Sequence, residues 1–109
     1  MIKFMVFVKK RRDLGRAEFE RHFREVHGPL VAALPGIKRY TQNILRPDGA
    51  AKSGTRQFDA LAELWFEDRA AFEAAWDTPE GKRAVADNEN YMDRTKSNWA
   101  VYDEHDLLG

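Results

Sequence analysis

The sequence contains no cysteine and no long hydrophobic run. Without a thiol, the 109-residue chain cannot form a disulfide scaffold, a thiolate metal site, a cysteine nucleophile or a thiol redox switch. Its longest apolar run, residues 4–8, is far shorter than the roughly 20 residues that a membrane-spanning helix needs, and it carries no signal-peptide cleavage site. We therefore expect no membrane partner and a cytoplasmic location.

Net charge is also absent, because 18 Lys and Arg residues balance 18 Asp and Glu residues. A chain without excess positive charge is not built to hold polyanions, so we expect no nucleic-acid partner. The sequence has no Gly-rich phosphate cradle, serine nucleophile elbow or dinucleotide fingerprint, and no cofactor is predicted. The charges are nevertheless uneven. Residues 1–12 are basic and residues 59–80 are mainly acidic, so the two segments are expected to pair, within a monomer or between monomers.

The length suits one domain over residues 1–109, and the apolar pattern predicts its elements. Strands are predicted over residues 2–9, 37–45, 58–66 and 99–105, and helices over 16–34, 68–76 and 79–88. This order is typical of an α+β fold, the ferredoxin-like split βαβ arrangement with a four-stranded antiparallel sheet. Residues 2–9 are apolar on both faces, and residues 58–66 have one apolar and one mixed face, so both strands are predicted to be central.

Specific residues mark the predicted helix ends. The expected N-terminal caps are Gly15 with Glu18 in the capping-box position, Asp68, and Thr78 followed by Pro79. Pro29 has no amide hydrogen to donate, so Gly28-Pro29 is predicted to divide the first helix from a final turn or two. Gly36 is expected to let the chain turn sharply into the next strand.

One face of the predicted sheet has no helix to cover it. Trp65 and Trp99 are expected to lie on that face, which would expose apolar area unless another sheet packed against it. A second copy of the chain is the simplest cover, so a face-to-face homodimer is predicted.

Histidines are the first candidates for chemistry. His22 and His27 both fall on the apolar stripe of the first helix and are expected to point toward the sheet. Each is either a core-edge histidine hydrogen-bonded to backbone or a general acid or base, since histidine titrates near neutrality. Their five-residue spacing places them roughly 140° apart around an α-helix, which argues against a shared metal ion. No metal site is predicted.

Polar residues on two strands complete the candidate site. Tyr40 and Gln42 share one strand face, and Tyr40 is either a hydrogen-bond donor to a substrate carbonyl or an anchor at the rim of the core. Glu63 either pairs with a cation such as Arg39 or is partly desolvated, with a raised pKa and a role in proton transfer. The candidate substrate-binding residues are Phe23, Gln42, Trp65 and Trp76.

Several motifs together resemble a known family. The segment from Arg16 to Val31 contains Phe19, the pair His22-Phe23 and a His-Gly-Pro sequence in that order. Further matches are Leu34-Pro35-Gly36, Tyr40-Thr41-Gln42-Asn43, Asp59 with residues 62–66, Thr78-Pro79-Glu80-Gly81 and Glu104-His105. The chain resembles the EthD family, named from ethyl tert-butyl ether degradation.

This resemblance implies a dimeric α+β barrel, in which two ferredoxin-like sheets pack face to face. It also implies that His27 and Tyr40 line the pocket, as in methylmuconolactone isomerase-like members. A cysteine discussed for those members has no counterpart here, and His22 replaces a residue that is usually aromatic in the family. The wider superfamily includes cofactor-independent monooxygenases, isomerases, polyketide cyclases and haem-handling proteins.

Two functional hypotheses follow. The first is a small oxidoreductase or monooxygenase, or an isomerase or cyclase, that acts without a cofactor on a cyclic or aromatic catabolite or polyketide-like ring, with His27 as acid/base and Tyr40 as donor. The second is a non-catalytic dimer that binds a hydrophobic ligand for a pathway partner. Haem binding through His22, His27 or His105 is a third option.

Overall fold

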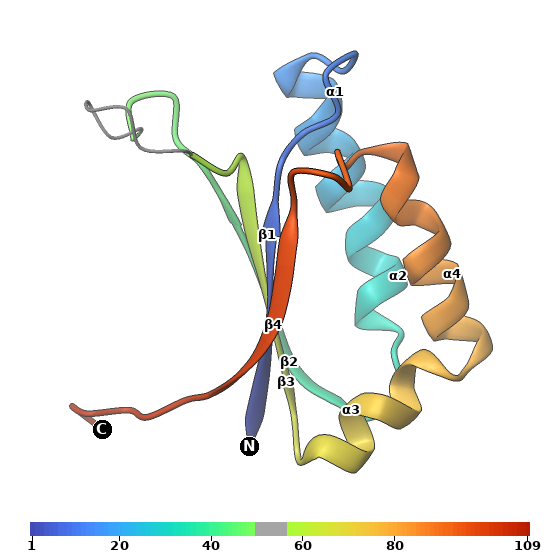
Figure 1. Cartoon of the computed structure of the whole chain (residues 1–109), viewed down its shortest axis with the longest axis vertical. Helices are drawn as coiled ribbons and strands as arrows, with labels where there is room; N and C mark the ends of the chain where they lie inside the picture. The colour runs from blue at the N-terminus through green and yellow to red at the C-terminus, as the bar shows by residue number, and fades with distance from the viewer. Residues whose placement is uncertain (50–56) are drawn as a thin grey trace.

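The computed structural model describes residues 1–49 and 57–109, in which all helices cover one face of an antiparallel sheet (Figure 1). The strands are β1 (Ile2–Val8), β2 (Ile37–Ile44), β3 (Ala60–Phe66) and β4 (Asn98–Asp103). The helical elements are α1 (Arg16–Arg21), η1 (His22–His27), α2 (Gly28–Ala32), α3 (Arg69–Trp76), α4 (Pro79–Asp87) and η2 (Asn88–Asn90). The predicted ferredoxin-like order of elements is confirmed.

The strand order is β2-β3-β1-β4, so the two strands predicted to be central are central. Residues that pair across the strands share a face of the sheet. Phe4 pairs with Leu64, which pairs with Tyr40, and this row faces the helices. Met5 pairs with Glu63, which pairs with Thr41, and this row faces away from them.

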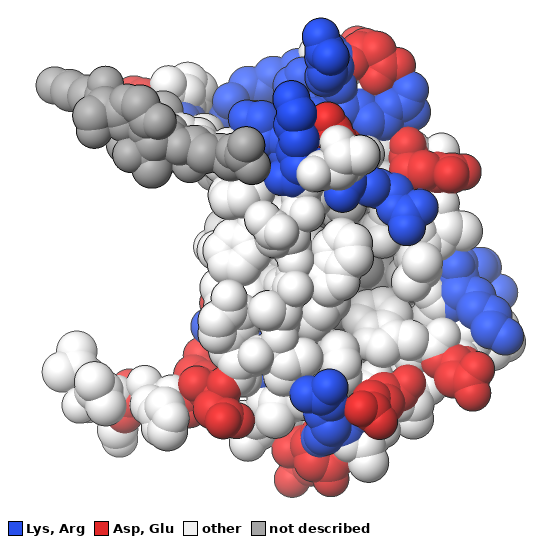
Figure 2. Space-filling model, viewed as in Figure 1, with Lys and Arg blue, Asp and Glu red and all other residues white. Residues whose placement is uncertain are grey.

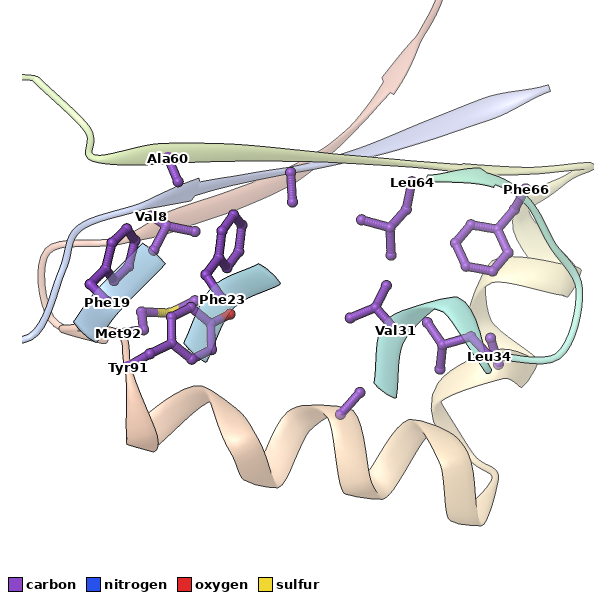
Figure 3. Close-up of a cluster of buried hydrophobic side chains, with 13 residues drawn as sticks. Val8, Phe19, Phe23, Val31, Leu34, Ala60, Leu64, Phe66, Tyr91 and Met92 are labelled. Atoms are coloured by element: carbon purple, nitrogen blue, oxygen red, sulfur yellow. The ribbon is translucent and has the colours of Figure 1, made fainter. Parts of the chain in front are cut away.

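The core fills the space between the sheet and the helices. Tyr91, Phe19, Phe23, Phe66 and Val8 are its largest fully buried side chains. Figure 3 shows Phe19, Phe23, Tyr91 and Met92 gathered around Val8 at one end, and Val31, Leu34, Leu64 and Phe66 at the other. The rings of Phe19, Phe23 and Tyr91 thus anchor the helices at the end of the sheet where β1 ends.

The first helix is divided at Gly28 as predicted, but the division begins earlier. Residues His22–His27 form a π-helical turn, in which the Gly28 amide donates to the Phe23 carbonyl five residues back. Pro29 has no amide hydrogen to continue an α-helical ladder, and the Phe23 carbonyl accepts a second hydrogen bond from Gln42 Nε2 at 2.7 Å. A π turn stabilised in this way is common at functional sites.

The structure tests the predicted caps individually. Asp68 accepts from the Ala71 amide and Thr78 Oγ1 accepts from the Gly81 amide, as predicted. The capping box at Gly15 and Glu18 is wrong, because no side chain caps α1 and only the Gly15 carbonyl accepts the Phe19 amide. Gly36 has a φ of 79°, which explains the need for glycine at this turn.

The sheet face away from the helices is more polar than predicted. Trp65 lies on it as expected, but Trp99 does not, because Trp99 pairs with Val6 on the helix side. The strand predicted over residues 58–66 begins only at Ala60, and Phe58, which strand alternation would place on the same face as Ala60, packs instead against Phe7 of the open face at 5.6 Å. The side chains of the open face are Lys3, Met5, Phe7, Arg39, Thr41, Asn43, Leu61, Glu63, Trp65, Asn98, Ala100 and Tyr102.

The predicted pairing of the basic and acidic segments is confirmed within the chain. Lys3 Nζ lies 2.6 Å from Glu63 Oε2, and the Lys10 amide donates to Asp59 Oδ2 at 2.8 Å. The Gly-, Pro- and Ser-rich sequence of residues 46–55 predicts an exposed loop. The structure describes this segment only through Gly49, and its remainder lies outside the described residues. Within residues 1–49 and 57–109, no helix is long and apolar enough to cross a membrane.

Candidate active site

A cavity of about 300 Å³ lies between the helix-facing side of the sheet and the helices. Figure 2 shows its opening as a hollow walled by uncharged atoms. Its apolar lining comes from Phe4, Val6, Val31, Ala62, Leu64, Phe72, Trp76, Ala84, Val85, Met92 and Trp99. Its polar lining comes from His27, Tyr40, Asn88, Tyr91 and Arg94. Apolar walls with a few placed polar groups are typical of small-molecule sites.

His27 is oriented by a buried carboxylate. Its Nδ1 lies 2.9 Å from Oδ2 of Asp87, the last residue of α4, and both side chains are buried. An ionised carboxylate can only accept, so Nδ1 carries the proton and Nε2 carries the lone pair. His27 Nε2 makes no hydrogen bond to the described residues, and His27 lines the cavity, so this nitrogen is available to a ligand there.

The π turn brings His22 to the same carboxylate. His22 Nε2 lies 2.8 Å from Asp87 Oδ1 and 3.0 Å from Oδ2. In a helix whose hydrogen bonds join residues five apart, residues five apart lie about one turn above each other. The angular separation of His22 and His27 that is expected for an α-helix is therefore absent. His22 itself lines a second hollow with Glu25 and is outside the main cavity.

Tyr40 is held by its neighbour on β2. Gln42 Nε2 donates to the Tyr40 hydroxyl oxygen at 2.7 Å and also donates to the Phe23 carbonyl. Because the phenol oxygen accepts the amide hydrogen, its own hydrogen is free to point elsewhere, and Tyr40 lines the cavity. Gln42 is absent from the cavity lining and acts on the site through Tyr40.

Burial and hydrogen bonding set the protonation states. Burial lowers the pKa of His27 below its usual value of 6.5 against the opposing effect of Asp87, so the ring is neutral at pH 7. Burial opposes ionisation of Asp87, but hydrogen bonds from Asn90, His22 and His27 outweigh it and lower the pKa of the carboxyl. Burial raises the pKa of Tyr40 to about 12, so its hydroxyl stays protonated. The site thus pairs a neutral base with a neutral donor.

Tyr91 forms the wall behind His27. Its ring lies 4.6 Å from the His27 ring and 5.7 Å from the His22 ring. Its hydroxyl donates to Asn88 Oδ1 at 3.3 Å, and burial raises its pKa. Tyr91 therefore helps to bury the His27 ring and leaves the Asn88 amide hydrogens for a ligand.

The predicted substrate-binding residues Phe23, Trp76 and Trp65 lie in three different places. Phe23 is fully buried and stacks on His27 at 6.2 Å, so it supports the ring from behind. Trp76 lines the cavity, as predicted for a substrate-binding residue. Trp65 lies on the opposite sheet face, where Lys3 and Arg39 sit over its ring at 4.8 and 4.6 Å.

Glu63 also lies on the opposite face and does not meet His27 or Tyr40. Burial opposes its ionisation, but hydrogen bonds from Lys3, Asn43 and Thr41 outweigh it and lower its pKa. Of the two interpretations that the sequence left open, pairing with a cation is the one observed, with Lys3 in place of Arg39. The raised pKa is not observed.

The sequence-based prediction missed Asp87, Asn88 and Arg94. One signal was available for Asp87, because the buried face of α4 is formed by Gly81, Ala84 and Asp87 at three-residue steps. A carboxylate on the buried stripe of a helix needs a partner and so marks a site. Although two histidines and Asp87 converge, no group of His, Asp and Glu among the described residues is arranged to hold a metal ion.

Comparison with known proteins gives matches in sequence and in structure. The EthD domain model matches residues 11–95. An uncharacterised 11.0 kDa protein of the thcB–thcC intergenic region of Rhodococcus erythropolis is 37% identical over 76 residues, covering 69% of this chain and 70% of that protein.

Three solved structures share the fold. An EthD family protein from Bacillus halodurans has a TM-score of 0.78 at 21% identity, over 96% of this chain and 99% of that chain. SnoaB, a cofactor-independent oxygenase from Streptomyces nogalater, has a TM-score of 0.69 at 19% identity, over 98% and 95%. A dimeric ferredoxin-like protein of unknown function from Thermobifida fusca has a TM-score of 0.71 at 16% identity, over 94% and 90%.

The family match covers the π turn, Tyr40 and Asp87, whereas Phe4, Val6 and Trp99 of the cavity lining lie outside it. The structural likenesses confirm the ferredoxin-like fold. The resemblance inferred from the His-Gly-Pro helix is thereby confirmed, and this chain belongs to the EthD family.

Proposed function

We propose that this chain is a cofactor-independent enzyme that removes a proton from an acidic carbon of a cyclic or aromatic substrate. The observation that carries this proposal is the pairing of His27 with buried Asp87 at the wall of an apolar cavity that Tyr40 also lines. The arrangement leaves one unprotonated ring nitrogen and one hydroxyl hydrogen for the substrate.

The proposed reaction starts with proton transfer from a ring carbon to His27 Nε2. The electron pair of the broken C–H bond moves into the adjacent carbonyl, and the Tyr40 hydroxyl donates a hydrogen bond to the resulting enolate oxygen. The imidazolium that forms is stabilised by Asp87. Return of the proton to another carbon completes an isomerisation. Attack of the carbanion on a carbonyl carbon of the same molecule instead closes a ring, and the carbonyl oxygen then takes the proton from His27. Attack of the carbanion on O₂ instead converts a ring CH₂ and O₂ into a ring carbonyl and water.

The comparisons support this class of chemistry in two ways. The chain shares its fold with SnoaB, which is described as a cofactor-independent oxygenase. It also belongs to the EthD family, whose domain model covers His27, Tyr40 and Asp87.

The experiment is deuterium exchange into anthrone, a neutral tricyclic ketone with an acidic ring CH₂. Exchange in D₂O without oxygen reports proton removal whatever reaction follows, and oxygen uptake in air reports the oxygenase branch. We expect His27→Gln to slow enzyme-dependent exchange by roughly 10²-fold or more, and Tyr40→Phe to slow it by roughly 10-fold or more.

The matched control is His105→Gln, which removes an exposed histidine of the C-terminal tail. It should exchange anthrone at the wild-type rate. Wild-type rates in folded His27→Gln and Tyr40→Phe would overturn the proposal and leave the cavity as a binding site without turnover.

We also propose that the enzyme is a homodimer formed through the open sheet face. Met5, Phe7 and Leu61 are only half-buried on that face, and the Thermobifida fusca structure of the same fold is described as dimeric. Met5→Asp should therefore yield a monomer by light scattering. Arg83→Asp, an exposed change on α4, should leave the dimer intact, and a dimeric Met5→Asp variant would refute this interface.

A further inference from the structure

The charge that lines the cavity is positive. Arg94 is its one charged lining residue at neutral pH, and no Asp or Glu among the described residues lines the cavity. Asp87 is screened from it behind His27, to which it is hydrogen-bonded. Arg94 also has no carboxylate partner within the described part of the chain. Arg94 is itself exposed, so it lines the cavity at the side that meets solvent. A cation at the mouth of an otherwise uncharged, apolar cleft attracts an anion to that cleft.

Arg94 is presented by a turn that is fixed to the sheet. The Asp93 amide donates to the Lys9 carbonyl at 2.8 Å, and Ser97 Oγ donates to the Asp93 carbonyl at 2.8 Å. The Lys9 amide in turn donates to Ser97 Oγ at 2.8 Å, and Asp93 Oδ1 accepts from the Thr95 amide and hydroxyl. The backbone on both sides of Arg94 is therefore held, which lowers the entropy lost when its side chain binds a ligand.

Arg94 and Tyr40 also come from opposite edges of the sheet. Tyr40 lies on β2, Arg94 shortly precedes β4, and these are the two outer strands. The Asn88 amide hydrogens are a further donor in the lining, because the Tyr91 hydroxyl engages only Oδ1. A ligand that reaches both sides of the cavity would place its reacting carbon at His27 and Tyr40 and a second polar group at the β4 side.

We propose that Arg94 forms an anion subsite of the cavity, and that the substrates are cyclic or aromatic compounds with a carboxylate on the side remote from the reacting carbon. This inference rests on the proposed function, because it assumes that the cavity is the substrate site. It adds a specificity residue that takes no part in the proton transfer.

The test uses two probes of matched shape, 2-naphthoate and its neutral analogue 2-naphthamide, titrated into the full chain by calorimetry at low ionic strength. The wild type should bind 2-naphthoate roughly fivefold to tenfold more tightly than 2-naphthamide. Arg94→Gln should remove this preference by weakening only the naphthoate complex. Lys96→Gln, which removes an exposed cation from the same turn but not from the cavity, should retain the preference.

The outcomes separate this inference from the proposed function. Equal binding of both probes by the wild type, or a preference that survives Arg94→Gln, overturns the anion subsite and leaves the His27 chemistry intact. If neither probe binds, the result counts against the cavity as a ligand site and so against both proposals. The same holds if a probe binds but leaves the NMR ring signals of His27 and Trp99 unshifted.

Discussion

Asp87 is the residue on which the geometry of the site depends, and Asp87→Asn is the most informative substitution. The change keeps the size of the side chain and removes its charge. The carboxylate is 7% exposed and accepts hydrogen bonds from His22, His27 and Asn90 at 2.8 to 3.0 Å. An asparagine can accept through one oxygen only, and its NH₂ group faces at least one of these donors.

The expected loss follows from the number of bonds affected. A hydrogen bond to a charged group contributes about 1.5–3 kcal/mol and a neutral one about 0.5–1.5 kcal/mol. Weakening three coupled bonds should therefore lower the free energy of unfolding by about 2–4 kcal/mol at pH 7. For a domain of this size, that is a fall of roughly 10–20 °C in Tm.

The assay is urea unfolding followed by tryptophan fluorescence, at one protein concentration so that association is held constant. The control is Asp48→Asn, because Asp48 is exposed and, within the described residues, forms a salt bridge with Arg46 alone, so this change should alter Tm little. The pKa of Asp87 is lowered, so the stability from its charge is present above the usual value of 3.8 and is lost as pH falls below it. An Asp87→Asn variant as stable as the wild type at pH 7 would refute the reasoning.

Three further predictions concern separate parts of the molecule. Because burial lowers the pKa of His27 and the neutral ring is the base, anthrone exchange should be constant above pH 6.5 and fall only at lower pH, and a midpoint above 6.5 in the rate profile would contradict this. Gly81→Ala would place a Cβ 2.4 Å from a carbonyl oxygen of α3 and should lower the free energy of unfolding by about 1–3 kcal/mol, whereas Gly15→Ala, whose nearest contact is 3.4 Å, should cost much less by the same urea titration. Glu63→Gln should leave the exchange rate unchanged, and a large loss of exchange would return Glu63 to the list of catalytic residues.

The fold was largely predictable because its signals are local. Alternating apolar residues identify β1 and β3 as central strands, and Thr78-Pro79 identifies the start of α4. The side of β4 was not predictable, because Trp99 and Val101 on one face and Ala100 and Tyr102 on the other are both apolar or aromatic. Only pairing with β1 decides which face turns to the helices.

The site was predictable in part for a similar reason. His27 and Tyr40 are marked by the His-Gly-Pro helix and by strand alternation. Asp87, the partner of His27, lies 60 residues later in the sequence, and the direction of its side chain depends on how α4 packs. The π turn has no pattern in the sequence that distinguishes it from an α-helix with a proline, so the convergence of His22 and His27 on one carboxylate followed only from the structure.

The central claim is that His27 offers an unprotonated Nε2 to the cavity while Asp87 holds the proton on Nδ1. The most direct measurement is the ¹⁵N NMR spectrum of the His27 ring in the wild-type protein at pH 7. We predict a protonated Nδ1 and an Nε2 with the chemical shift of an unprotonated ring nitrogen. A protonated Nε2, in either the other tautomer or the imidazolium, would contradict the account.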